Sequence, residues 1–192
     1  MYTNPMSDPA FQRMSVAEYL RSEPDSPVKR EYVDGFVYPL HAQAGASKAH
    51  ARISGNIYAA LHADALRMGC RLYQSDMKLR LNGSTTFFYP DVLVACGPDN
   101  PADDFETEPC LLVEVLSPST AANDRVGKYG VYTALPSLQT YLMVEQAERR
   151  VYAYERRGDA WTLTELKGGG EIALPCLGCC LSLDDVYRAV LP

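Results

Sequence analysis

Two short apolar runs, each with one carboxylate inside it, limit what this chain can fold into. They span residues 89–95 and 110–116, and their acidic residues are Asp91 and Glu114. Runs of this length and composition are typical of buried β-strands. A charged carboxylate in a buried strand is costly unless it is paired or binds a metal ion. The sequence therefore predicts two strands whose carboxylates converge on one divalent cation.

The composition is typical of a globular protein, with 192 residues of which 47% are hydrophobic and 22% are charged. We expect a loose N-terminal tail over residues 1–12 and a single domain over residues 13–192. No stretch approaches the ~20 apolar residues that cross a bilayer, so no membrane partner is expected. The start of the chain does not resemble a secretory signal, which favours a cytoplasmic location.

The net charge of −6 argues against broad, non-specific binding to nucleic acid. It does not exclude a nuclease, because the carboxylates of a metal site add negative charge and a local basic face can bind the substrate.

The six cysteines stand at positions 70, 96, 110, 176, 179 and 180. In a cytoplasmic protein we expect their thiols to be reduced. Cys96 and Cys110 belong to apolar runs and are predicted to be small core residues. The group Cys176, Cys179 and Cys180 favours packing over a zinc site, because a structural zinc ion needs four ligands and no second pair is evident.

Local patterns in the first half predict alternating helices and strands. A capping box at Ser15 begins a helix that runs to about residue 22, and Asp34-Gly35 turns a hairpin over residues 29–38. Ser47 caps a long helix that ends at Gly69 and whose apolar face begins at His50. A single strand is predicted over residues 70–81.

The second half continues the same alternation. The two carboxylate strands are separated by a polar loop over residues 97–108 and followed by a helix over residues 121–134. Further strands are predicted over residues 140–144, 151–155 and 161–166, and a closing helix over residues 181–191. The chain is therefore expected to form one α/β domain.

Magnesium prefers oxygen ligands and retains several waters. Asp91, Glu114 and the backbone carbonyl of Val115 supply three such oxygens. Lys128 is the cation available to position the attacking water. It follows Asp124 by one helical turn, so the two side chains can also pair with each other.

These residues resemble a known family. The runs Tyr89-Pro-Asp-Val-Leu-Val and Val113-Glu-Val-Leu-Ser-Pro-Ser-Thr120, followed by Asp124 and Lys128-Tyr129, are similar to the Uma-two family of proposed endonucleases. That family belongs to the PD-(D/E)xK nuclease superfamily. The resemblance extends from the Ser15 helix to residues 183–187, and the segment from Glu114 to Thr120 is its most specific part.

The resemblance implies a restriction-endonuclease-like fold, with a central mixed β-sheet flanked by helices. It implies Asp91 and Glu114 as ligands of Mg²⁺ or Mn²⁺ and Lys128 as the catalytic lysine. The superfamily usually places that lysine two residues after the glutamate, where this chain has Leu116. A further acid from an early element is expected. Glu31 is preferred for it, with Asp34 as the alternative.

Each residue also has a plainer interpretation. Asp91 can cap a turn, Glu114 can form a structural ion pair and Lys128 can be an exposed helix lysine. Ser117 and Ser119 can cap the following helix or contact a phosphate. His50 can be a core histidine or support the site.

The first functional hypothesis is a metal-dependent endonuclease that hydrolyses phosphodiester bonds, with DNA as the expected partner and a homodimer as an open alternative. The second is a non-catalytic binding or scaffold protein that retains the nuclease fold. The third is a redox or zinc module built on Cys176, Cys179 and Cys180.

Overall fold

The structure, a computed structural model, describes residues 13–40, 47–81, 85–99, 101–102, 104–116 and 127–191. Its helices are α1 (Val16–Ser22), α2 (Lys48–Met68), α4 (Tyr129–Tyr132) and α5 (Leu183–Val186). None of the helices in these residues is long and apolar enough to cross a membrane.

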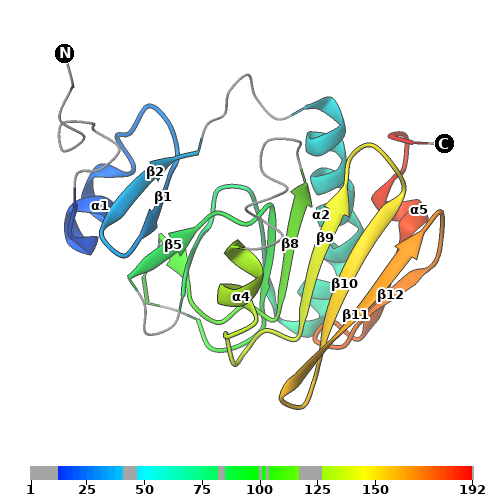
Figure 1. The fold of residues 1–192 in the computed structure, drawn as a ribbon. Helices are drawn as coiled ribbons and strands as arrows, with labels where there is room; N and C mark the ends of the chain where they lie inside the picture. Colours follow the sequence, from blue (N-terminus) through cyan, green and yellow to red (C-terminus); the bar gives the residue numbers. More distant parts are fainter. Residues whose placement is uncertain are drawn as a thin grey trace.

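The largest of the described sheets has six strands in the order β11-β10-β9-β8-β6-β3 (Figure 1). They are β11 (Ala160–Lys167), β10 (Arg150–Arg157), β9 (Thr140–Glu145), β8 (Leu111–Leu116), β6 (Val92–Ala95) and β3 (Arg71–Gln74). β8 and β9 run parallel, whereas β6 and β8 are antiparallel. The expectation of a mixed sheet flanked by helices is confirmed.

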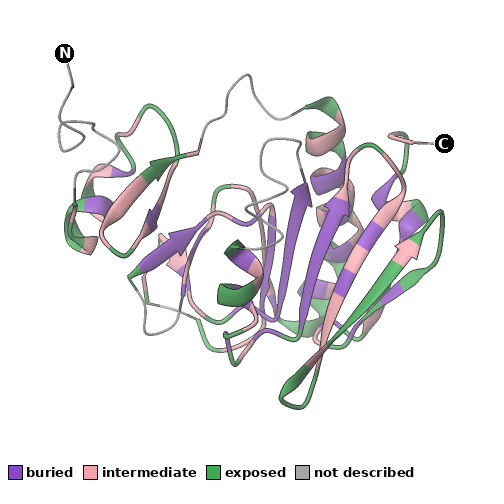
Figure 2. Ribbon diagram, viewed as in Figure 1, coloured by how far each residue is buried: buried purple, intermediate pink, exposed green. Residues whose placement is uncertain are grey.

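The central strand β8 is buried along its whole length (Figure 2). Its side chains alternate between two hydrophobic layers because successive residues of a strand point to opposite faces. Val113 and Val115 pack in the layer that contains Ile53 and Ile57 of α2. Leu112 and Leu116 pack in the opposite layer, which contains Tyr132 of α4. Glu114 shares the parity of Leu112 and Leu116.

A second sheet has the described strand order β2-β1-β5-β4-β7. These strands are β2 (Phe36–Pro39), β1 (Arg30–Val33), β5 (Thr86–Phe88), β4 (Lys78–Arg80) and β7 (Phe105–Glu106). The predicted hairpin is β1–β2, and Asp34 and Gly35 both have the positive φ angles that its tight turn requires. The predicted capping box of α1 is present, since Ser15 and Glu18 exchange hydrogen bonds.

α2 lies against one face of the six-stranded sheet and α4 against the other (Figure 1). As predicted, the side chain of Ser47 caps α2 and Gly69 ends it in the left-handed conformation, with φ 66°. Gln146 Nε2 donates to Leu116 O at 2.7 Å, and the Gln146 side chain also hydrogen-bonds Ser47. This link holds the start of α2 beside the end of β8.

The prediction of one strand over residues 70–81 is wrong, because the chain leaves one sheet at β3 and enters the other at β4. The break lies at Ser75, which has φ 61° and donates its N–H to Asp91 O at 3.0 Å. The loop predicted over residues 97–108 contains the short strand β7.

The closing segment also differs from the prediction. A hairpin of β12 (Glu171–Leu174) and β13 (Cys179–Ser182) precedes α5, so helix over residues 181–191 is wrong except for one turn. The helix predicted over residues 121–134 is described only from residue 127 onward, where α4 begins at Tyr129. Cys70 and Cys96 form a disulfide, which corrects the expectation that all thiols are reduced.

Candidate active site

Asp91 lies directly before β6, at the end of the sheet to which β8 points. The antiparallel register pairs Val92 with Val113, so one further step places Asp91 opposite Glu114. Side chains of directly opposed residues share a face of the sheet and have Cβ atoms ~5 Å apart. The register thereby explains how carboxylates 23 positions apart in the chain come together.

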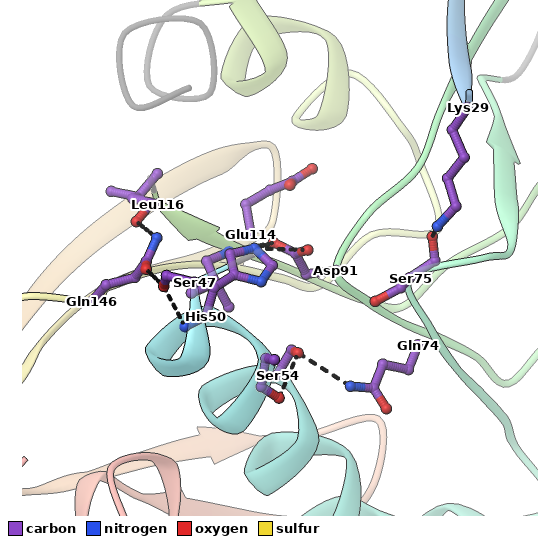
Figure 3. A network of polar contacts seen from close by, with 12 residues as sticks. Lys29, Ser47, His50, Ser54, Gln74, Ser75, Asp91, Glu114, Leu116 and Gln146 are labelled. Atoms are coloured by element: carbon purple, nitrogen blue, oxygen red, sulfur yellow. Dashed lines mark hydrogen bonds and ion pairs between the residues drawn. The ribbon is translucent and has the colours of Figure 1, made fainter. Parts of the chain in front are cut away.

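The Asp91 carboxylate is held by a backbone amide and by a histidine (Figure 3). Val115 N–H donates to Asp91 Oδ2 at 2.7 Å. His50 Nε2 lies 3.1 Å from Oδ1 and 3.2 Å from Oδ2. The side chains of His50 and Asp91 are 18% and 17% exposed, so the pair lies near the surface without being solvated on all sides.

Glu114 is the most buried of the predicted acids, with 4% of its surface exposed. Its Oε1 accepts hydrogen bonds from Lys128 Nζ at 3.0 Å and from the Tyr132 hydroxyl at 2.8 Å. Lys128 directly precedes α4, and its Nζ also lies 5.6 Å from the centre of the Phe88 ring. A buried carboxylate needs such partners, because desolvation otherwise disfavours its charge.

Tyr132 is the neutral donor in this group. Burial raises the pKa of Tyr132 well above its usual value, and the negative charge of Glu114 raises it further. The hydroxyl therefore remains protonated at neutral pH and keeps donating to Glu114.

Glu31 of β1, in the second sheet, also contributes to the group around Lys128. Its Oε1 lies 3.2 Å from Lys128 Nζ, within ion-pair distance. That oxygen is buried and accepts no hydrogen bond from the described residues. Asp34, the alternative acid, instead accepts a hydrogen bond from the exposed Thr85 hydroxyl at 2.7 Å. The geometry thus favours Glu31 over Asp34.

This set of groups is compatible with a divalent cation. Among the described residues, the carboxylates of Glu31 and Glu114 flank Lys128, and Asp91 stands opposite Glu114 in the strand register. Glu31 Oε1 has the charge of Lys128 nearby but accepts no hydrogen bond from the described residues, and a cation or its water could supply that partner. Carboxylate oxygens with a nearby backbone carbonyl, such as that of Val115, are the ligands that Mg²⁺ and Mn²⁺ prefer.

Comparison with known proteins shows which family this chain is similar to. Residues 16–184 match the Uma2 family, which is described as "Putative restriction endonuclease". The chain belongs to the Uma2 family.

Two Synechocystis proteins, both named only as uncharacterized, are similar to this Uma2 chain. One, slr1290, is 36% identical over 183 residues, which cover 94% of each chain. The other, sll1609, is 39% identical over 162 residues, covering 81% of this chain and 88% of the relative.

A solved structure shares the fold. It is the crystal structure of a protein from Anabaena variabilis described as "a putative nuclease belonging to DUF820". The TM-score is 0.73 at 16% identity, and the match covers 93% of this chain and 99% of the other. The predicted nuclease-like fold is therefore confirmed.

The structure brings together Glu31, Asp91, Glu114 and Lys128, with His50 against Asp91. Ser117, Ser119 and Asp124 lie outside the described residues, so the expected Asp124–Lys128 pair is not described.

Sequence reasoning did not single out Tyr132, Phe88 or Gln146. The one available signal was that Tyr132 follows Lys128 by four positions, so that a helical turn aligns the two side chains. Gln146 follows β9 with no motif around it, and its role depends on the parallel pairing of β8 with β9.

Proposed function

We propose that this Uma2 protein is a Mg²⁺- or Mn²⁺-dependent endonuclease that hydrolyses phosphodiester bonds in DNA. The observation that carries the proposal is the meeting of Asp91, Glu114 and Lys128 at one end of the sheet. Family membership supports the same reaction class.

Asp91, Glu114 and the Val115 carbonyl are the proposed metal ligands. When bound, the cation would neutralise charge on the phosphate and lower the pKa of a coordinated water. His50 and the Val115 N–H orient the Asp91 carboxylate. The Tyr132 hydroxyl does the same for the Glu114 carboxylate.

Lys128 supplies positive charge at the reacting phosphate in this proposal. Lys128 directly precedes α4. The position two residues after Glu114, where the superfamily usually has its lysine, is occupied by Leu116, which packs in the core. Because the Phe88 ring and the two glutamates limit its freedom, little reorganisation is needed when the substrate binds.

Substrate approach is expected over the basic side chains beside the site, because the whole chain carries a net charge of −6. Lys48 is exposed in the first turn of α2, two residues before His50. Lys29 donates to Ser75 O at 3.0 Å, and Ser75 in turn donates to Asp91 O.

The test is cleavage of supercoiled plasmid DNA with Mg²⁺ or Mn²⁺, compared for wild type, Asp91→Asn and Glu114→Gln. These substitutions preserve shape and remove charge. We expect each to lower the rate at least about 100-fold, more than is typical for residues that only support a ligand. Asp159→Asn, an exposed change in the β10–β11 turn, is the matched control and should cut like wild type.

Cleavage by both variants at the wild-type rate would contradict the proposal. Titration calorimetry with Mn²⁺ separates it from the second hypothesis, a non-catalytic binding protein. That hypothesis is favoured by one observation, that Lys128 is already paired with Glu114 and Glu31. Wild-type protein that binds DNA but neither binds Mn²⁺ nor cuts would support it.

A further inference from the structure

Four cysteines meet at the end of the large sheet opposite the candidate active site. Cys70 directly precedes β3, Cys96 follows β6 and Cys110 precedes β8. Cys176 lies in the turn between β12 and β13. In Figure 1 the arrow of β8 points toward the Glu114 end of the strand, so Cys110 stands at its tail.

The strand registers account for three of the four. Arg71 pairs with Ala95, so Cys70 and Cys96 stand opposite each other one step beyond. Cys110 N–H donates to Val94 O at 2.7 Å, which places this residue beside the same end of β6. The sulfurs of Cys70, Cys96 and Cys110 therefore lie together at one end of the neighbouring strands β3, β6 and β8. The β12–β13 hairpin adds the fourth sulfur, that of Cys176.

The sulfur atoms are close enough to share one ion. Cys96 is bonded to Cys70, and its Sγ lies 3.4 Å from Cys110 Sγ. The Sγ atoms of Cys96, Cys110 and Cys176 all lie within 4.8 Å of one another. In a tetrahedral zinc site the Zn–S distance of ~2.3 Å corresponds to sulfurs ~3.8 Å apart. Once Cys70 and Cys96 are separate thiols, rotation about their Cα–Cβ bonds is the movement that would bring the four sulfurs to this spacing.

The backbone around the four cysteines is tied in place by two arginines. Arg71 Nη1 donates to Gly97 O at 3.0 Å, next to Cys96. Arg67 Nη2 donates to Leu177 O at 3.0 Å, next to Cys176.

We propose that the reduced protein binds one Zn²⁺ through the thiolates of Cys70, Cys96, Cys110 and Cys176, and that the Cys70–Cys96 disulfide is its metal-free, oxidised form. Conversion requires a dithiol or phosphine reductant. Two electrons reduce the disulfide to two thiols while the reductant is oxidised. The four thiols then lose their protons as the ion binds.

This site differs from the one that the sequence indicated. Cys179 lies beside the side chain of Asp64 on α2, and Cys180 is exposed. Of the group Cys176, Cys179 and Cys180, only Cys176 joins the cluster. The second pair that a zinc site needs was hidden in the sequence because each other member comes from a separate strand.

The proposed role is structural. The ion would bind the β12–β13 hairpin to the start of β3, the end of β6 and the start of β8. Cys110 and Glu114 are four residues apart on one strand, about 13 Å at ~3.3 Å per residue. The zinc proposal does not depend on nuclease activity, and each can fail without the other.

The experiment uses full-length protein treated with a phosphine reductant and then titrated with Co²⁺ and with Zn²⁺. We expect one ion per chain, with the absorption bands of tetrahedral thiolate coordination when Co²⁺ is bound. Cys110→Ser and Cys176→Ser should weaken binding at least roughly 100-fold, since a structural site needs all four ligands. Cys180→Ser is the matched control and should bind like wild type. Unreduced wild type should bind no ion at this site.

A second measurement requires no variant. Zn²⁺ should protect Cys70, Cys96, Cys110 and Cys176 of the reduced wild type from alkylation and leave Cys180 reactive, as read by peptide mass spectrometry. The proposal is overturned if reduced wild type binds no ion, if Cys110→Ser and Cys176→Ser bind as tightly as wild type, or if protection falls on Cys179 and Cys180.

Discussion

Replacing Lys128 with methionine tests whether the buried charges of the site depend on one another. Lys128 Nζ lies 3.0 Å from Glu114 Oε1 and 3.2 Å from Glu31 Oε1. At an effective dielectric constant of 20, each contact is worth roughly 5 kcal/mol before desolvation is subtracted. The side chains of Lys128 and Glu114 are 11% and 5% exposed, so water cannot replace the lost cation at Glu114.

We therefore expect Lys128→Met to lower the free energy of unfolding by about 3–5 kcal/mol, the usual cost of removing one partner of a buried pair. The measurement is urea-induced unfolding in buffer with a chelator, so that no divalent cation replaces the lysine. Adding Glu114→Gln to the same protein removes the stranded charge, and the double variant should regain stability relative to Lys128→Met alone.

Two results would refute this reasoning. A loss below about 1 kcal/mol for Lys128→Met is the magnitude of an exposed pair, and it would mean that water reaches Glu114. A double variant whose loss equals the sum of the two single losses would mean that Lys128 and Glu114 are energetically independent.

Two further outcomes follow from the site and from the buried tyrosines. His50→Leu removes the ring that contacts both Asp91 oxygens. It should weaken Mn²⁺ binding, measured by calorimetry, and plasmid cleavage by roughly 10–100-fold each. Unchanged values for both would exclude a positioning role for His50. Burial raises the pKa of Tyr19, Tyr132 and Tyr187 above 10.0. The folded state keeps protons that the unfolded state releases, so the free energy of unfolding should fall only as the pH rises above about 10, and urea titrations across that range check it.

Features set by neighbouring residues could be predicted from the sequence. The Ser15 capping box, the Asp34-Gly35 turn and the Gly69 helix end depend on groups a few positions apart, and the structure contains all three. Glu114 was identifiable because a buried charge is costly wherever its strand lies. Lys128 was identified as the cation that follows the second carboxylate strand, one helical turn after Asp124, whereas the expectation of an early acid, and with it Glu31, came from the family resemblance.

Features that depend on distant contacts were missed. The predicted strand is interrupted at Ser75 because the Ser75 N–H donates to Asp91 O. That acceptor is 16 residues away in the sequence, so no local pattern indicates it. The β12–β13 hairpin was missed because its connection, Pro175-Cys-Leu-Gly178, lacks the Asp-Gly signal that marks the β1–β2 turn. The partners of Glu114 became clear only after α4 was placed over the sheet, where Tyr132 reaches the carboxylate.

The bond from Val115 N–H to Asp91 Oδ2 gives one side chain two separate duties. This carboxylate replaces the backbone acceptor that the ladder between β6 and β8 lacks at its last rung, and it also faces the proposed metal. A related protein without the proposed catalysis would still need a hydrogen-bond acceptor at position 91 to close the sheet. An aspartate at this position in a relative is therefore weak evidence for nuclease chemistry, because the sheet itself requires it. A lysine at position 128 is stronger evidence, because Lys128 completes no strand pairing.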